Sequence, residues 1–549
     1  MAGKQTFRWA LVCAAIAGAA IGGPGCAETS CEETRTCAGP SSGGAGGAGA
    51  TGGKGGTWGT GGTGTGGTGT GGQPPVGSFG ITVAPKTATV IDGSQVEIQV
   101  TVARQDFTEA ISVDLVGLPS GVTAPTVVAT QLETSVKLII TAATVTKHGA
   151  FPITVRGRSS ADEKTAQLDL LARGAAGTRD NSFTDSGVSV FGEWTRPRAM
   201  ALAADGKIYV AGEAGSTAGN THAYFLSRFH ADGDLDSAFG TSGSVVRYTT
   251  ANTGVHAARG VYLDAQGRAV VGGYFSGNQV FVARFDPTGA LDPTFATAGE
   301  ITGPGFSVLA LTGQGAKVVA SGKNDKTPAH AIVARSDANG APDNPFGAQS
   351  IATINTTSYA SEATSIAVDA ANRIVVAGTT NKAGGTVMVA RVTPSGAMDT
   401  FATAGIAWLD PGNGGLTTGL ALRPDKRIVV GGGATGDKYF LFQLDDQGAP
   451  DPTFGTSGLA TGTAMRIDAL TLDGSGRVVV AGRVGQSLGV ARFGTDGKPE
   501  AGFGSSGFAT VGGTLTPQAV LILPDGRAIV LGVGQAVADD RLVLTRVWM

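Results

Sequence analysis

Between Ser78 and Gly174, short runs of the chain alternate apolar and polar residues, as in Val96-Glu-Ile-Gln-Val-Thr-Val102. A side-chain period of two is typical of a β-strand that buries one face. Turn residues such as Asp92-Gly93 separate the runs. The runs lie at Phe79–Val83, Val96–Val102, Ile111–Leu115, Val136–Ile140, Phe151–Val155 and Ala166–Leu170. This spacing predicts an antiparallel β-sandwich over residues 78–174.

From about residue 180 to the end, the pattern changes to a repeat. One copy reads Arg477-Val-Val-Val-Ala-Gly482, then Val490-Ala-Arg-Phe493 and then Glu500-Ala-Gly-Phe503. Each copy has a basic residue, an apolar run ending in Gly, a second apolar run ending in Arg, a Gly turn, and an acid three residues before Phe. The basic residues recur every 49 to 61 positions, at Lys207, Arg268, Lys317, Arg373, Arg427, Arg477 and Arg527. This period indicates propeller blades or a solenoid, and four short strands per unit favour a propeller.

Two resemblances follow from these motifs. The repeat combines Asp-Gly-Arg/Lys, Val-Val-Ala-Gly, Ala-Arg-Phe, Asp-Gly-x-Leu-Asp and Phe-Gly, and it resembles the delta-60 β-propeller repeat of bacterial exported proteins. This resemblance implies a fold but no reaction and no catalytic residues. The segment Leu115-Val-Gly-Leu-Pro-Ser-Gly-Val122 resembles bacterial immunoglobulin-like modules, without their cysteine pair. We therefore expect an all-β chain, with an immunoglobulin-like β-sandwich at 78–174 and a seven-bladed β-propeller at 178–549.

Two spacings within the repeat vary, and both concern loops. The basic residue and the Arg of the next apolar run are 15 to 21 positions apart, and the Phe and the next basic residue are 22 to 29 apart. In a propeller these two connections emerge on the same face. Loops tolerate change and carry binding groups, so we expect function on that face.

An arginine and an acid stand eight residues apart in most copies. They are Arg228/Asp236, Arg284/Asp292, Arg335/Asp343, Arg391/Asp399 and Arg492/Glu500, with Gln443 opposite Asp451 in one copy. A ring of ligand-binding charges is one interpretation. Recurrence in every blade instead favours a structural role, because a site needs asymmetry, and we predict bidentate pairs that fix each hairpin. The recurring Phe is expected to pack between blades.

The last copy stops after its third strand, close to Arg546, and lacks the acid, the Phe and the fourth strand. Those parts occur before the first complete copy, as Asp180-Asn-Ser-Phe183 and Gly187-Val-Ser-Val-Phe191. We predict that this N-terminal strand completes the last blade and that Arg546 meets Asp180.

The N-terminus predicts export. Residues 1–25 combine Lys4 and Arg8 with an apolar stretch too short to span a bilayer, which is typical of a signal peptide. Lipidation of Cys26 would leave Cys31 and Cys37 as a disulfide pair; cleavage after Ala27 would leave the same pair. The rest of residues 26–77 is a Gly/Thr-rich tether. We expect a bacterial outer-membrane or cell-surface lipoprotein or a secreted protein.

The amino-acid composition limits the classes of partner that we expect for this chain. A net charge of −3 with 15% charged residues argues against a nucleic-acid surface, and membrane contact is expected only through the lipid anchor. The propeller has no cysteine, and its histidines have no metal-like spacing, so we expect no metal or cofactor. His148 is expected to be a solvated turn residue.

The predicted function is non-catalytic binding of an extracellular protein or glycan by a monomer, through the variable-loop face. The alternative is a propeller hydrolase or lyase that acts on an extracellular polymer such as a polysaccharide. Acids outside the repeat positions could pair in such an enzyme, although their spacing does not indicate it. They are Glu193, Glu213, Glu362, Asp410 and Asp437.

Overall fold

The computed structural model describes residues 77–184, 186–192, 195–215, 223–248, 256–275, 279–354, 359–383, 386–412, 414–434, 436–535 and 540–549. All named elements in these ranges are β-strands. No helix in the described ranges is long and apolar enough to cross a membrane. The predicted signal peptide, the tether, Cys26, Cys31 and Cys37 lie outside the described residues.

Residues 78–173 form two sheets. One has the order β1 (Ser78–Ala84), β3 (Gln95–Gln105), β7 (Ser135–Ala142) and β5 (Val122–Thr123). The other has the order β2 (Thr87–Ile91), β9 (Glu163–Arg173), β8 (Gly149–Arg158), β4 (Ile111–Val116) and β6 (Val127–Ala129). Each predicted strand is present. One pairing differs from the antiparallel prediction, because β2 continues β1 into the second sheet after two residues and pairs in parallel with β9.

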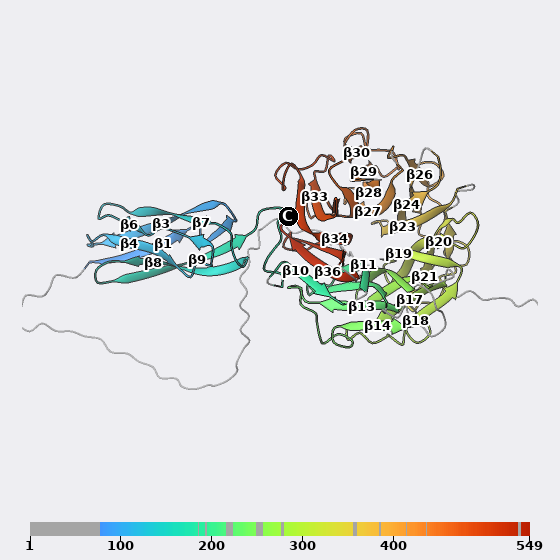
Figure 1. Cartoon of the computed structure of the whole chain (residues 1–549), viewed down its shortest axis with the longest axis horizontal. Coiled ribbons are helices and arrows are strands. Elements are labelled where there is room, and N and C mark those ends of the chain that lie inside the picture. Colours follow the sequence, from blue (N-terminus) through green and yellow to red (C-terminus); the bar gives the residue numbers. More distant parts are fainter. Residues whose placement is uncertain are drawn as a thin grey trace, which may run out of the picture.

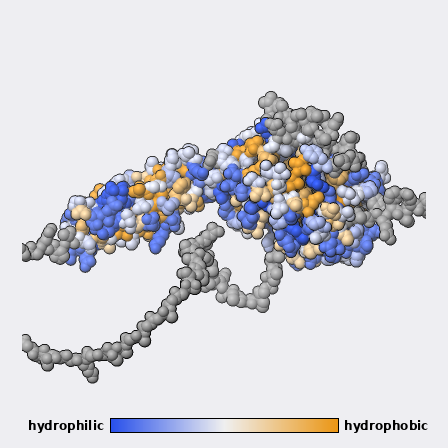
Figure 2. Space-filling view, turned by 90° about the horizontal axis from the view of Figure 1, so that it is seen from below, coloured by the Kyte–Doolittle hydropathy of each residue, from blue (hydrophilic) through white to orange (hydrophobic). Residues whose placement is uncertain are grey.

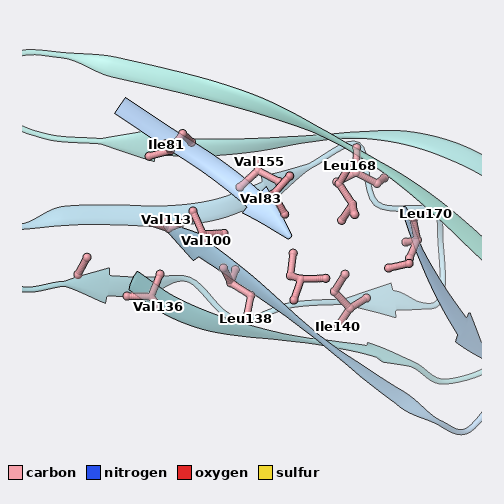
Figure 3. Close-up of a cluster of buried hydrophobic side chains, with 14 of the residues drawn as sticks. Ile81, Val83, Val100, Val113, Val136, Leu138, Ile140, Val155, Leu168 and Leu170 are labelled. Carbon is pink, nitrogen blue, oxygen red and sulfur yellow. The ribbon is translucent and has the colours of Figure 1, made fainter. Parts of the chain in front are cut away.

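The predicted alternation fills the core between these sheets. Along β3, Ile98, Val100 and Val102 are buried while the residues between them are exposed. Figure 3 shows Val100, Leu138 and Val155 among side chains from different strands that converge on one core. Burying such a side chain contributes about 1.5–3 kcal/mol relative to leaving it exposed, so the period-two pattern accounts for the stability of this part.

The repeat region forms antiparallel sheets of consecutive strands. The first two sheets are β11 (Thr195–Leu202), β12 (Ile208–Ala214), β13 (Ala223–Phe229), β14 (Ser244–Tyr248) and β15 (His256–Leu263), β16 (Ala269–Phe275), β17 (Gln279–Phe285), β18 (Glu300–Pro304). The next two are β19 (Phe306–Gln314), β20 (Lys317–Asn324), β21 (Ala331–Ser336), β22 (Ile351–Thr353) and β23 (Ser361–Val368), β24 (Ile374–Thr380), β25 (Val387–Val392), β26 (Ile406–Leu409). A further four-stranded sheet is β27 (Leu416–Leu422), β28 (Ile428–Ala434), β29 (Lys438–Leu444), β30 (Leu459–Gly462).

The remaining strands form one sheet because β34 is long enough to serve two units. Its order is β10 (Val188–Phe191), β36 (Asp540–Val547), β35 (Ala528–Gln535), β34 (Phe508–Ile522), β33 (Ser487–Phe493), β32 (Val478–Val484) and β31 (Arg466–Leu472). The first part of β34 pairs with β33 and the second part with β35. At the far edge, β10 pairs with β36, so a strand from the start of the repeat region completes the sheet that ends the chain.

The first strand of each unit lies innermost. Figure 1 shows β11, β19, β23, β27 and β34 around the centre, with β14, β18 and β30 at the periphery. Contacts run from β11 to β15, β19, β23, β27, β31 and β34 in turn, and β34 contacts β11. The inner strands therefore close a circle, which is the arrangement of a β-propeller.

Figure 2 shows the sandwich as an elongated body that joins the rounded propeller at one side. His148 lies at this junction and is only 4% exposed. Its Nε2 atom lies 3.0 Å from Asp92 Oδ2, and Trp548 Nε1–H donates to its Nδ1 over 3.2 Å. Asn181 Oδ1 accepts a hydrogen bond from the His148 backbone over 2.8 Å. The prediction of a solvated turn residue is wrong, because residues from both ends of the propeller cover this turn.

Candidate functional site

The structure brings together the predicted arginine–acid pairs. Arg228 Nε lies 2.7 Å from Asp236 Oδ2, and the two residues are 6% and 3% exposed. The same contact measures 2.8 Å for Arg284–Asp292, 2.6 Å for Arg335–Asp343, 2.5 Å for Arg391–Asp399 and 2.7 Å for Arg546–Asp180, and it also joins Arg492 to Glu500. In each complete unit except the one with Gln443, the pair links the third strand to the turn that follows it. Arg546 and Asp180 make the same link between the end and the start of the repeat region.

These pairs differ from the bidentate pairs that we predicted. In the first unit, one oxygen of Asp236 accepts from the backbone N–H of Ala238, which leaves the other for Arg228. Arg228 Nη1 instead donates to Pro287 O in the next sheet over 2.5 Å. The corresponding bonds are Arg284–Ala338 (2.7 Å), Arg335–Pro394 (2.7 Å), Arg391–Asp446 (2.6 Å) and Arg546–Ala231 (2.9 Å). These arginines therefore fasten one sheet to the next.

The recurring Phe completes this arrangement. The Arg228 guanidinium carbon lies 4.6 Å from the centroid of the Phe239 ring, and Phe239 is fully buried. All members of this Phe set are fully buried: Phe183, Phe239, Phe295, Phe346, Phe401, Phe454 and Phe503. We call each set of arginine, acid and Phe a corner cluster. In each corner cluster that has an arginine, the guanidinium group therefore lies against both a carboxylate and an aromatic face within the fold.

The lowered pKa of Asp236 is consistent with an ion pair inside the fold. Burial alone would raise the pKa of Asp236, but hydrogen bonds from Arg228 and Lys207 outweigh burial and hold the pKa below its ordinary value. Where Gln443 replaces the arginine, Arg423 donates to Gln443 Oε1 over 2.7 Å and also bonds Gly476 O in the next unit. A second arginine thus restores the missing link between sheets.

A different feature recurs on the innermost strands. Each pairs with the second strand of its unit, and each pairing skips one residue near the start of the inner strand, which is a β-bulge. Opposite the bulge lies the Gly that ends the repeat's apolar run. A Cβ atom on Gly482 would lie 1.8 Å from Arg466 O, and one on Gly273 would lie 1.8 Å from Ala257 O. The repeated Gly therefore permits the bulge.

The bulge residues are not repeated in kind. In chain order they are Arg198, Arg259, Leu309, Thr364, Thr418, Asp468 and Gln518. The residue after each repeated Gly also varies: Glu213, Tyr274, Lys323, Thr379, Gly433, Arg483 and Val533. Both sets lie at the end of the circle of inner strands where the variable-length connections join the strands. We call these two sets the channel mouth. Bulges re-aim side chains and occur often beside functional sites.

Several channel-mouth side chains bond across neighbouring sheets. Arg198 Nε donates to Glu213 Oε1 over 2.9 Å, and Arg198 Nη1 donates to Gln518 Oε1 over 3.1 Å. Arg259 Nη2 donates to the Tyr274 hydroxyl over 2.8 Å and lies 3.7 Å from Glu213 Oε1. Cross-strand bonds therefore hold both arginines in fixed positions on β11 and β15.

A second charged group lies on β31 and β32. Arg466 Nε lies 3.0 Å from Asp468 Oδ1, and Arg483 Nε donates to Asp468 Oδ2 over 3.0 Å. On β20 and β23, Lys323 Nζ donates to Glu362 Oε2 over 2.8 Å. A cavity of about 240 Å³ lies beside this last pair and is lined also by Ser361, Thr379, Thr380 and Asn381.

The acids outside the repeat positions do not converge. Glu213 and Glu362 belong to the first and fourth sheets of the repeat region and pair with different cations. Asp410 and Asp437 lie in connections between strands, and Glu193 lies outside the described residues. Among the residues that the structure describes, no group of three His, Cys, Asp or Glu side chains is placed to hold a metal ion.

The channel mouth was missed in the sequence, although a signal for it exists. The repeated Gly was treated as the end of a strand, whereas its lack of a Cβ admits the neighbouring backbone. The residue that follows this Gly changes from copy to copy while its surroundings do not. That variation marks one of the two sets at the mouth.

Known proteins support the fold. A family described as a domain of unknown function (DUF5122) beta-propeller matches residues 203–239 and 267–295. The match includes the repeat motifs of the first two sheets, and the chain is a β-propeller protein. A search of curated proteins found no match.

Solved structures give weak likenesses. A quinonprotein alcohol dehydrogenase-like protein from Bacteroides thetaiotaomicron has a TM-score of 0.34 and 11% identity, covering 78% of this chain and 94% of its own. The titin domains Z1Z2 in complex with telethonin give a TM-score of 0.14 and 11% identity, covering 42% and 95%. Likeness at this level carries no argument about this chain.

Proposed function

We propose that the chain is an exported protein in which a Gly-rich tether and an immunoglobulin-like spacer, residues 78–174, present a seven-bladed propeller, residues 178–549. The circle of seven inner strands and the pairing of β10 with β36 support the blade number. The two packed sheets of residues 78–173 support the spacer.

We further propose that the propeller is a non-catalytic binding module and that its ligand enters the channel mouth. The supporting observation is the contrast between repeated and unrepeated positions. Corner clusters repeat nearly the same residues around the circle, with Gln443 in place of one arginine and Glu500 in place of one aspartate, and their charges are used in bonds within and between sheets. Bulge positions share one backbone geometry but carry Arg, Leu, Thr, Asp or Gln, which supplies the asymmetry that recognition of a ligand requires.

The arrangement of acids favours binding over the alternative of a hydrolase or lyase. A glycosidase needs two carboxyl groups on opposite sides of one bond, about 5–9.5 Å apart. Glu213 is held by Arg198 and Glu362 by Lys323, on separate sheets. They therefore do not form the opposed pair of carboxyl groups that a glycosidase uses.

An array screen of the full chain against glycans, peptides and small organic acids tests the proposal. A ligand that is found should lose affinity at least tenfold in Thr364→Trp, which enlarges a bulge residue at the mouth. Thr400→Trp, which enlarges an exposed residue at a corner on the opposite face, serves as the matched control. Equal loss in both variants, or none in either, contradicts the proposed site. Shortening of a bound polysaccharide with time would establish the enzyme instead.

A further inference from the structure

The channel mouth is divided into two halves of different charge. Along the circle of inner strands, β31, β34, β11 and β15 are consecutive neighbours. The Arg196 charge on β11 is balanced by Asp540 on β36. Apart from that pair, these inner strands and their partners β32 and β12 carry the charged residues Arg466, Asp468, Arg483, Arg198, Glu213 and Arg259. We call this half the basic arc. Four guanidinium groups and two carboxylates leave it with a net charge of +2, although the whole chain carries −3.

The other half is neutral. Its bulge residues are Leu309, Thr364 and Thr418, and the residues that follow its Gly positions are Lys323, Thr379 and Gly433. The Lys323 charge is balanced by Glu362. Its hydroxyl groups are bonded to the backbone: Thr364 donates to Thr417 O over 3.3 Å, and Thr418 donates to Gly431 O over 3.4 Å. The Thr379 hydroxyl accepts from the Thr417 N–H over 3.3 Å. The oxygens of Thr364 and Thr418 can still accept a hydrogen bond from a ligand hydroxyl.

Within the basic arc, Arg259 is only partly satisfied. Its side chain is 26% exposed, and its guanidinium carbon lies 5.3 Å from the centroid of the Tyr274 ring. Among the described residues, no acceptor bonds its buried Nε. A buried donor without an acceptor is unfavourable. The Nε atom itself is covered, so a ligand oxygen would approach the exposed part of the Arg259 side chain.

The charges divide into two groups of equal sign. Arg198, Arg259 and Glu213 sum to +1, and Arg466, Arg483 and Asp468 also sum to +1. Each group can therefore neutralise one negative charge. A carboxylate carries one charge at pH 7, whereas a phosphate monoester carries about −1.5 to −2. The planar guanidinium fork matches the geometry of a carboxylate.

We infer that the channel mouth binds a hydroxylated carboxylic acid, such as an acidic sugar, with the carboxylate at Arg198 and Arg259 and the hydroxyl groups toward the neutral half. This inference rests on the proposed binding function and specifies its ligand. The net positive charge of the basic arc attracts a ligand of the opposite sign, and added salt screens that attraction. Affinity should consequently fall as salt is added.

Three sugars that differ only at one carbon test the ligand class. Full-length protein is titrated calorimetrically at low ionic strength with D-glucuronate, D-glucose 6-phosphate and D-glucose. We expect glucuronate to bind at least tenfold more tightly than glucose and more tightly than the phosphate. Arg259→Gln and Arg198→Gln should each weaken glucuronate binding at least tenfold. The control Arg247→Gln, whose arginine pairs with Glu300 on outer strands, should change it less than twofold.

Each other outcome has a defined meaning. Equal binding of glucose and glucuronate, unchanged affinity in both arginine variants, or no binding of glucuronate overturns the inference. If glucose 6-phosphate binds more tightly than glucuronate, the inference of a carboxylic acid is overturned and the ligand class is a phosphate ester. Any of these results leaves the proposed function standing if the array screen still finds a ligand that Thr364→Trp excludes. Thermal unfolding of every variant distinguishes a lost contact from a lost fold.

Discussion

The corner clusters and the channel mouth use the same kinds of side chain for opposite purposes. At the corners, Arg228 has its acid, a backbone carbonyl of the next sheet and an aromatic face. At the mouth, Arg259 has a tyrosine hydroxyl, a distant carboxylate and a bare Nε. Arg228 therefore fixes the structure, whereas Arg259 keeps part of its side chain exposed to a ligand. A charged pair that recurs from copy to copy of a repeat therefore favours a structural role over a ligand-binding site.

The largest effect should come from removing the strand that closes the circle. A chain that begins at residue 194 lacks β10 and Asp180, so β36 becomes an open edge and Arg546 loses its acid. Open edges promote aggregation. We expect this chain to aggregate or to melt far lower than one that begins at Gly177, measured by calorimetry. Equal melting temperatures would disprove closure by β10.

A point substitution tests the same corner more finely. Asp180→Ala leaves the buried Arg546 without its carboxylate, and breaking a buried ion pair costs about 3–5 kcal/mol. Asp540→Ala removes an acid whose partner Arg196 is largely exposed, and such pairs contribute about 0–1 kcal/mol. Urea unfolding should separate the two variants clearly. Similar values would show that closure does not depend on the corner cluster.

The glycines that permit the bulges can be tested within one sheet. Gly482→Ala would place a Cβ 1.8 Å from Arg466 O, and overpacking against backbone costs about 1–3 kcal/mol or more. Gly474→Ala is the control, because a Cβ there meets no atom within 4 Å. A Gly482 variant as stable as the control would mean that the bulge is not needed.

A fall in pH should destabilise the corner cluster that contains Asp180. Burial would raise the pKa of Asp180, but hydrogen bonds from His148 and Ser182 and the Arg546 charge outweigh burial and hold the pKa well below its ordinary value. A folded pKa below the unfolded value of about 3.9 stabilises the protein above that pH, and the stabilisation is lost as pH falls. Unfolding free energy should drop below pH about 4, and less steeply in Asp180→Asn. A parallel drop in both would remove Asp180 as a cause.

The smallest effect on stability is expected at the mouth. Arg259→Gln gives up one exposed-edge bond to Tyr274 and one long ion pair. We expect unfolding free energy to change by no more than about 0.5 kcal/mol, while glucuronate binding falls. A loss of stability as large as that of Asp180→Ala would place Arg259 with the structural arginines.

Much of the architecture follows from the sequence by itself. A period of two residues requires strands, and a repeat of basic residue, Gly, Arg, acid and Phe requires identical units that bury their faces on one another. The last copy of the repeat lacks a fourth strand, and a spare strand precedes the first copy. These two features predict that β10 completes the last sheet and that Asp180 meets Arg546. These are local or repeated features, so neighbours along the chain, or the same place in another copy, reveal them.

Only the tertiary structure decided the rest. The second nitrogen of Arg228 reaches Pro287, far along the chain, so no spacing within one unit could predict that the pair is not bidentate. His148 is buried because Asn181 and Trp548 come from opposite ends of the propeller. The channel mouth forms because closing the circle brings one bulge from each inner strand to the same end of that circle. Residues that never approach one another in sequence acquire a common role only through that closure.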